Sequence, residues 1–154
     1  MKPSERMAAL EIALPKAPAP VGNYVPAIRS GHHVLTSGQL PMRDGELVCM
    51  GKVGSDVTVE EACAAAGLAA LNGLAAAAEV AGGLDRIARV IRLCVYVNSA
   101  AGFTDQPKVA NGASDLLFGI FDSAGRHARS AVGVAELPLN AAVELELIVE
   151  VLDV

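Results

Sequence analysis

Two charged side chains near the carboxyl end of the chain have the types and spacing that carboxylate chemistry needs. Arg129 begins a predicted strand whose following residues, 130 to 134, should be substantially buried. A guanidinium beside apolar backbone suits a bidentate grip on a carboxylate, and an internal ion pair with a glutamate is the alternative. Glu144, fifteen residues later, could orient or deprotonate a water. A solvated strand face, shared with Glu146 and Glu150, is its alternative.

A second group of polar residues carries weaker signals. Ser37 and Gly38 end an apolar strand and could present a hydroxyl and backbone N–H groups to an anion, although a structural strand-end serine is the alternative. No G-x-S-x-G elbow surrounds Ser37, which argues against a serine hydrolase. His32, His33 and His127 match no metal-binding spacing, and the glycines form no nucleotide-binding loop. We expect neither a metal nor an organic cofactor, and we expect His127 on a surface loop.

Composition and charge exclude several classes of partner. The chain has 154 residues, a formal net charge of −5 and 3% aromatic residues, which argues against nucleic acid. Three cysteines without a C-x-x-C pair indicate free thiols, and no apolar run of a secretory signal occurs near Met1, so we expect a cytoplasmic protein. Residues 62 to 78 carry no charge, but alanine dominates them and glutamates flank them. This pattern predicts a buried helix and no membrane partner.

Two helices are predicted from capping residues and hydrophobic spacing. Thr58 and Glu61 have the spacing of a capping box, and Gly82-Gly83 supplies a stop, which predicts a helix over residues 59 to 81. Its surface is mostly alanine and glycine, so it could lie close against a sheet or a neighbouring helix. A second helix is predicted from near Asp105, with a proline in its first turn, and ends by Ser123.

The strands complete an α+β fold in the order β-β-(β)-α-β-α-β-β. The predicted strands are one that begins near Tyr24, one at 33 to 40, a short one at 47 to 50, and three at 89 to 97, 129 to 136 and 142 to 152. We expect one domain over residues 16 to 154, preceded by an N-terminal extension at residues 1 to 15.

The last two strands bear on both the site and the assembly. Only the short turn at residues 137 to 140 separates them, so we expect them to pair and to place Arg129 beside Glu144. The final strand alternates between an apolar face and a mostly acidic face, and the strand at 89 to 97 is apolar on both faces. Two helices can cover only one face of such a sheet. We expect other subunits to cover the second face.

Four segments together resemble the Rid family (YjgF-type) of reactive imine and enamine deaminases. The segments are residues 21 to 25 (VGNYV), 36 to 41 (TSGQLP), 109 to 111 (VAN) and the run from 128 to 138 (ARSAVGVAELP) that continues to 143 to 146 (VELE). The resemblance implies a chorismate-mutase-like α+β fold and a homotrimer with three ligand clefts between subunits. The region from 43 to 58 and the N-terminal extension differ from the compact members, so the chain looks closer to a divergent subgroup.

The resemblance also assigns roles to single residues. It places Arg129 on the arginine that binds the substrate carboxylate, and Glu144 on the glutamate that positions water. Tyr24, Ser37, Gly38 and Asn111 fall on residues of the cleft, with Gly38 as a backbone contact. The cysteine that many relatives have two residues after the arginine is Ala131 here.

The implied reaction is the hydrolytic deamination of 2-imino and enamine acids to 2-keto acids and ammonia. It needs no metal or organic cofactor, because the imine is already electrophilic. Two other functions stay open: a non-catalytic protein that binds or senses a small carboxylate through the same cleft, and an endoribonuclease, a description that some relatives carry. The acidic charge and the scarce aromatic residues disfavour the last of these.

Overall fold

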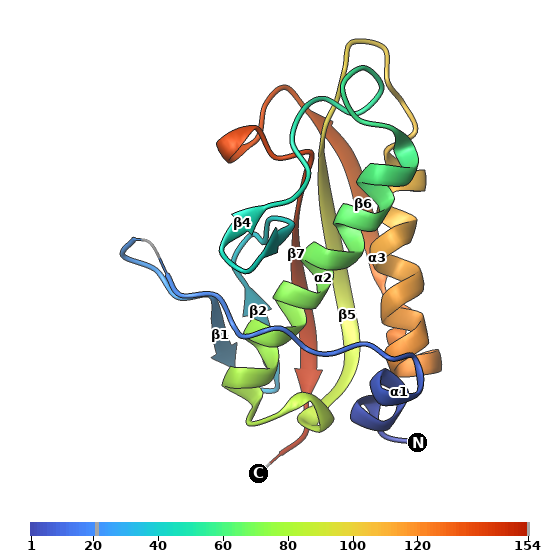
Figure 1. Cartoon of the computed structure of the whole chain (residues 1–154). Helices are drawn as coiled ribbons and strands as arrows, with labels where there is room; N and C mark the ends of the chain where they lie inside the picture. The colour runs from blue at the N-terminus through green and yellow to red at the C-terminus, as the bar shows by residue number, and fades with distance from the viewer. Residues whose placement is uncertain (21, 154) are drawn as a thin grey trace.

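A five-stranded sheet and two long helices form the core of the protein (Figure 1). The computed structural model describes residues 1–20 and 22–153. Both long helices, α2 (Val59–Ala81) and α3 (Gln106–Phe121), lie on one face of the sheet, whose strand order is β1-β2-β7-β5-β6. The strands are β1 (Ala27–Ser30), β2 (His33–Thr36), β5 (Ile87–Asn98), β6 (Ala128–Val134) and β7 (Val143–Val151). Only the β5–β6 pair is parallel, so the expected mixed sheet with two helices on one face is confirmed.

The helix α2 has the limits that the sequence predicts. The Glu61 N–H donates to Thr58 Oγ1 at 3.1 Å, and the Thr58 N–H donates to Glu61 Oε2 at 2.9 Å, which completes the capping box. Gly82 ends the helix at a φ of 87°, in the left-handed region. By length and composition α2 could cross a membrane, but most of it is buried inside the protein. It is a core helix, as predicted.

Glycine lets α2 and α3 approach each other closely. A Cβ added to Gly112 of α3 would stand 1.9 Å from the carbonyl oxygen of Cys63 in α2, and a Cβ on Gly67 would stand 3.5 Å from the Gly112 carbonyl oxygen. No side chain fits at Gly112 unless a backbone moves. This contact fixes the position of α3, and with it that of the neighbouring Asn111.

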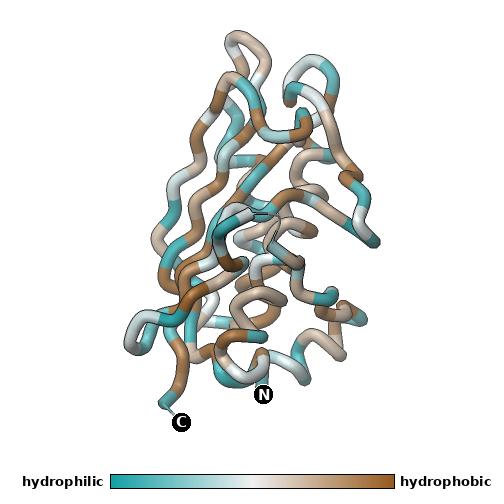
Figure 2. The backbone as a smooth tube through the Cα atoms, turned by 90° about the vertical axis from the view of Figure 1, so that its left-hand side faces the viewer, coloured by the Kyte–Doolittle hydropathy of each residue, from teal (hydrophilic) through white to brown (hydrophobic). Residues whose placement is uncertain are grey.

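The central strands β5 and β7 separate a covered face from an open one. Along β7 the odd-numbered residues are buried beneath the helices and the even-numbered ones are half-buried, an alternation that Figure 2 shows as changing hydropathy along the strands. On the open face Ile28, Leu35 and Val132 are 58%, 36% and 45% exposed, although all three are apolar. One chain therefore leaves this face without a cover.

The expected pairing of the last two strands is wrong. The strand β6 pairs in parallel with β5 alone, whereas β7 lies between β2 and β5. The reason is the connection β5-α3-β6, since a strand, helix and strand in series place the two strands side by side in parallel. The connection from β6 to β7 contains the short 3₁₀ helix η3 (Pro138–Asn140) and crosses the end of β5 to reach the far side of that strand.

The first strands differ from prediction mainly in their limits. The strand β1 begins at Ala27 rather than near Tyr24, after Pro26, which has no N–H to donate to a ladder. The hairpin of β1 and β2 turns at Gly31, with a φ of 62°. The short strand expected at 47 to 50 is replaced by a small hairpin of β3 (Met42–Arg43) and β4 (Glu46–Leu47). Val21, in the first resembling segment, lies outside the described residues.

The N-terminal extension packs onto the rest of the chain. It contains the helix α1 (Pro3–Ala9), whose Met7 is buried in the common core. The Ser4 hydroxyl donates to Asp85 at 2.7 Å, in the 3₁₀ helix η1 (Leu84–Arg86). Arg6 pairs with Asp122 at 2.9 Å, at the start of the 3₁₀ helix η2 (Asp122–Gly125). Polar contacts from Ser4 and Arg6, and the buried Met7, thus hold the extension against the helical layer.

Candidate active site

Arg129 lies on the helix side of the sheet and is held by α3. It is opposite Leu93 of β5, whose side chain is fully buried beneath the helices. Its Nη1 donates to Asn111 Oδ1 at 2.8 Å and to Ser114 Oγ at 3.1 Å. Among the residues that the structure describes, no carboxylate lies within 4.0 Å of this guanidinium. The alternative of an internal ion pair is therefore not realised in the single chain, and the cation is free for an external anion.

His127 stands behind Arg129 and corrects the expectation of a surface loop residue. It is half-buried, with Nδ1 at 2.6 Å from the Gly125 carbonyl oxygen and Nε2 at 2.9 Å from Ser114 Oγ. Sequence reasoning missed both His127 and Ser114. The signals were present, because Ser114 follows Asn111 by three residues on a helix and His127 precedes Arg129 by two residues along the chain.

Glu144, Gly38 and Ser37 form a second cluster at the start of β7. A Cβ added to Gly38 would stand 2.2 Å from Glu144 Oε1, so the carboxylate occupies the space that a larger residue would fill. The Ser37 hydroxyl donates to the Val25 carbonyl oxygen at 2.6 Å, and its lone pairs stay available as acceptors. This bond ties down the segment that carries Tyr24, which is 51% exposed.

The electrostatics of this cluster favour a proton acceptor. Burial, and next the negative charge of Glu146, raise the pKa of Glu144 above its ordinary value. Glu146 accepts a hydrogen bond of 3.0 Å from the Tyr96 hydroxyl. The pKa of Tyr96 is raised, first by its interaction with the Cys94 side chain, then by burial and by Glu146. Of these two neighbouring glutamates, Glu144 lies beside Gly38 and Glu146 accepts a hydrogen bond from Tyr96.

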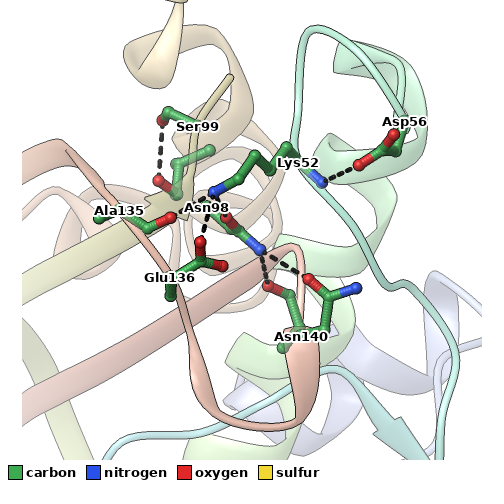
Figure 3. Close-up of polar contacts among 9 residues, drawn as sticks. Lys52, Asp56, Asn98, Ser99, Ala135, Glu136 and Asn140 are labelled. Carbon is green, nitrogen blue, oxygen red and sulfur yellow. Dashed lines mark hydrogen bonds and ion pairs between the residues drawn. The ribbon is translucent and has the colours of Figure 1, made fainter. Parts of the chain in front are cut away.

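A polar cluster at the end of β5 fixes the connection that leads into β7 (Figure 3). The Lys52 ammonium donates to Asn98 Oδ1 at 3.0 Å and to the Ala135 carbonyl oxygen, and it pairs with Glu136 at 3.3 Å. The buried Asn98 donates from Nδ2 to the Ala141 carbonyl oxygen at 3.1 Å. Lys52 lies in the region from 43 to 58, where the sequence predicts a difference from the compact relatives. Here that region anchors the chain just before Glu144.

The structure brings the predicted site residues together as two clusters, which we call the arginine half-site and the glutamate half-site. The arginine half-site contains Arg129 and Asn111, and the glutamate half-site contains Glu144, Gly38, Ser37 and the segment of Tyr24. Arg129 is level with Leu93 of β5, whereas Glu144 is level with Tyr96, so the two side chains point to opposite faces of the sheet.

The two half-sites are also far apart within one chain. Their strands are separated by β5, and their register differs by three residues, which amounts to about 10 Å both along and across the sheet. One chain cannot apply Arg129 and Glu144 to one small ligand. Ala131, two residues after Arg129, packs against the core and offers no thiol. Within residues 1–20 and 22–153, no three His, Cys, Asp or Glu side chains are grouped as metal ligands.

The fold and the two half-sites define a small domain of the chorismate-mutase-like α+β class, with charged groups on both faces of one sheet. Residues 4–151 match the family described as "YjgF/chorismate_mutase-like, putative endoribonuclease". The chain belongs to this family, which is the Rid family that its sequence resembles.

Individual relatives cover nearly the whole chain. Protein TCP17 of Trypanosoma cruzi is 49% identical over 142 residues, which are 92% of this chain and 89% of that protein. A 2-iminobutanoate/2-iminopropanoate deaminase of Dermatophagoides farinae is 33% identical over 140 residues, 90% of this chain and 93% of that protein. The crystal structure of a "putative endoribonuclease" from Shewanella oneidensis has a TM-score of 0.93 at 38% identity, and covers 98% of this chain and 100% of that one.

Proposed function

We propose that the protein hydrolyses 2-imino acids, and the enamines in equilibrium with them, to 2-keto acids and ammonia. The observation that carries this proposal is the pair of half-sites: an arginine without a carboxylate partner, and a partly buried glutamate with a raised pKa. A cation that binds a carboxylate and a base that activates water are the two groups that hydrolysis of a carboxylated imine needs. Several relatives named as 2-iminobutanoate/2-iminopropanoate deaminases support the choice of substrate class.

The proposal requires a homotrimer in which each active site joins half-sites from two subunits. Arg129 and Glu144 point to opposite faces in one chain, so only a neighbouring copy can bring them together. The exposed apolar side chains Ile28, Leu35 and Val132 give the open face a reason to be buried in such an assembly. A closed ring of three copies would form three equivalent sites.

In each site the arginine half-site holds the substrate. Arg129 binds the carboxylate through its guanidinium, and Asn111 lines the same wall of the cleft. Tyr24 and Ser37 of the partner subunit shape the other wall. Because the hydrogen of the Ser37 hydroxyl is donated to Val25, its oxygen is left to accept a hydrogen bond from the imine nitrogen.

The glutamate half-site supplies the water. Glu144 of the partner subunit accepts a proton from water as the water oxygen bonds to the imine carbon and the C=N electron pair moves to nitrogen. The protonated carboxyl then returns that proton to the amine nitrogen. Glu144 next takes the proton of the new hydroxyl and passes it to the same nitrogen, so that the carbonyl forms as the C–N bond breaks and ammonia leaves with the 2-keto acid. Imine and water are consumed and keto acid and ammonia are produced, with no change of oxidation state.

The test is ammonia release from freshly generated 2-iminopropionate. We expect Arg129→Ala to lower kcat/KM about 100-fold or more, since a charge-assisted bidentate contact is lost. Arg129→Lys should have a kcat/KM between those of the wild type and Arg129→Ala, because lysine keeps the positive charge but cannot make a bidentate contact. Arg126→Ala is the matched control, since Arg126 is an exposed neighbour whose guanidinium lies over the Phe118 ring, 5.5 Å from its centroid. Wild-type activity in Arg129→Ala would refute the proposal.

Two other outcomes would replace the proposed imine hydrolysis with a different function. Saturable binding of 2-oxobutyrate without faster imine hydrolysis would identify a carboxylate-binding protein that uses the same arginine half-site. Cleavage of RNA by a repurified sample, lost in Glu144→Gln, would favour the endoribonuclease description that the family carries. The net charge of −5 opposes this last function.

A further inference from the structure

A line of hydrogen bonds runs from the backbone to Arg129 through two side chains that the proposed mechanism does not use. The Gly125 carbonyl oxygen is 2.6 Å from His127 Nδ1, His127 Nε2 is 2.9 Å from Ser114 Oγ, and Ser114 Oγ is 3.1 Å from Arg129 Nη1. The three polar side chains are each half-buried. They come from three elements, namely α3, β6 and the segment before β6.

The chemistry of the two ends fixes where each proton lies. A carbonyl oxygen can only accept, so His127 carries a hydrogen on Nδ1. In the neutral ring Nε2 is then an acceptor, and the Ser114 hydroxyl donates to it. The guanidinium can only donate, so Ser114 Oγ accepts from Arg129. With a neutral His127 ring, every donor in the line faces an acceptor, and the directions of all three bonds follow.

This arrangement decides which edge of the guanidinium is free. Nη1 has two hydrogens, and they are directed to Asn111 Oδ1 and Ser114 Oγ. A carboxylate can bind a guanidinium side-on, through Nε and Nη2, or end-on, through Nη1 and Nη2. With both hydrogens of Nη1 engaged, only the edge of Nε and Nη2 remains for a bidentate contact.

We infer that His127 and Ser114 are positioning residues that hold the guanidinium of Arg129 so that it presents its Nε and Nη2 edge to the substrate carboxylate. The inference rests on the proposed function. Arg129 binds the carboxylate in both the ground state and the transition state, so loss of its orientation weakens both equally and raises KM more than it lowers kcat.

Matched variants separate positioning from simple packing. His127→Leu keeps the size of the ring but removes the acceptor, and Ser114→Ala removes the hydroxyl. We expect each to raise KM about tenfold and to change kcat less than about twofold, the size expected for the loss of one hydrogen bond in the line that orients the guanidinium. His127→Gln returns an acceptor near the position of Nε2 and should recover most of the loss. Equal KM values in His127→Leu and His127→Gln overturn the inference.

Two further measurements separate this inference from the proposed function. A long-range ¹H–¹⁵N correlation spectrum of the protein without ligand should show His127 as the Nδ1–H tautomer, and the Nε2–H tautomer overturns the inference. The affinity for 2-oxobutyrate should fall about tenfold in His127→Leu and Ser114→Ala, as KM does. If the wild type binds 2-oxobutyrate but does not hydrolyse imines, the proposed function fails while these two results still support the positioning role.

Discussion

Glu144 and Glu146 lie two residues apart on the same face of β7, and the second carboxylate changes how the first titrates. Burial, and next the charge of Glu146, raise the pKa of Glu144. A base must be ionised to accept a proton, so a raised pKa means that acidification abolishes activity at a higher pH. Glu146→Gln removes the repulsion, and we expect the acid limb of the kcat/KM profile to move to lower pH.

The matched control is Glu150→Gln. It makes the same change of charge on the same face of β7, but at the opposite end of the strand, opposite His33 and Arg89. Its acid limb should coincide with that of the wild type. An unmoved limb in Glu146→Gln, or the same movement in both variants, would contradict the assignment of Glu144 as the base.

A substitution at Gly38 tests the position of the Glu144 carboxylate. The Cβ of Gly38→Ala would stand 2.2 Å from Glu144 Oε1, the end of a flexible side chain that can move aside. The fold should survive with little change in Tm, while kcat falls about 100-fold, as expected when a catalytic group is displaced by about 1 Å. Kinetics beside a thermal melt would check this, and an unchanged kcat would show that Glu144 does not act from its observed position.

The candidate residues could be predicted from the sequence, but the side chains around them could not. Asn111 and Arg129, matched through the family resemblance, meet at 2.8 Å in the structure. Ser114 and His127 were missed because neither belongs to a resembling motif, and their roles depend on α3 packing against β6. Spacing along one element can show which residues share a face, but not which faces of two elements meet.

The close contact between α2 and α3 allows the packing of these two helices to be tested by substitution. A Cβ on Gly112 would overlap the Cys63 carbonyl of α2, so Gly112→Ala forces two helices apart. We expect a loss of stability of about 1–3 kcal/mol, the usual cost of overpacking, and a Tm lower by about 3–10 °C. Because α3 carries Asn111 and Ser114, KM should rise as well.

Gly119→Ala is the control on the same helix. Its added Cβ would meet only the end of the Leu10 side chain, at 3.3 Å, and alanine is the better helix former. Its Tm should equal or exceed that of the wild type. Equal melting of the two variants would mean that α2 and α3 can separate at no cost, contrary to the observed contact.

The limits of the helices were predictable and the order of the strands was not. Local signals define α2, since the capping residues Thr58 and Glu61 and the stop at Gly82 act within one turn. A short loop between two strands suggested a hairpin of β6 and β7, but strand order depends on contacts that loop length does not reveal. The composition of β6 held a clue, because Arg129, Ser130 and Gly133 suit an edge strand better than a central one.

The strand order has a consequence for the whole molecule. With β5 between β6 and β7, Arg129 and Glu144 are on opposite faces of one chain, so the proposed mechanism requires assembly. The apolar open face, expected from the alternation of the sequence to need a cover, is where a second subunit would add its surface. Under the proposed function, the open face of the sheet serves both subunit contact and catalysis.

Mixed oligomers test this directly. Arg129→Ala and Glu144→Gln should each be inactive alone, because every site in a homotrimer then lacks one half. If a site takes Arg129 from one subunit and Glu144 from its neighbour, co-expression in equal amounts gives each site about one chance in four of two intact halves. We expect about one quarter of the wild-type rate of ammonia release from the unfractionated trimers, and about one third from trimers purified to contain both variants. If one chain supplied both groups, no site would be intact and mixing would restore nothing, so the recovered rate distinguishes a shared site from a site within one subunit.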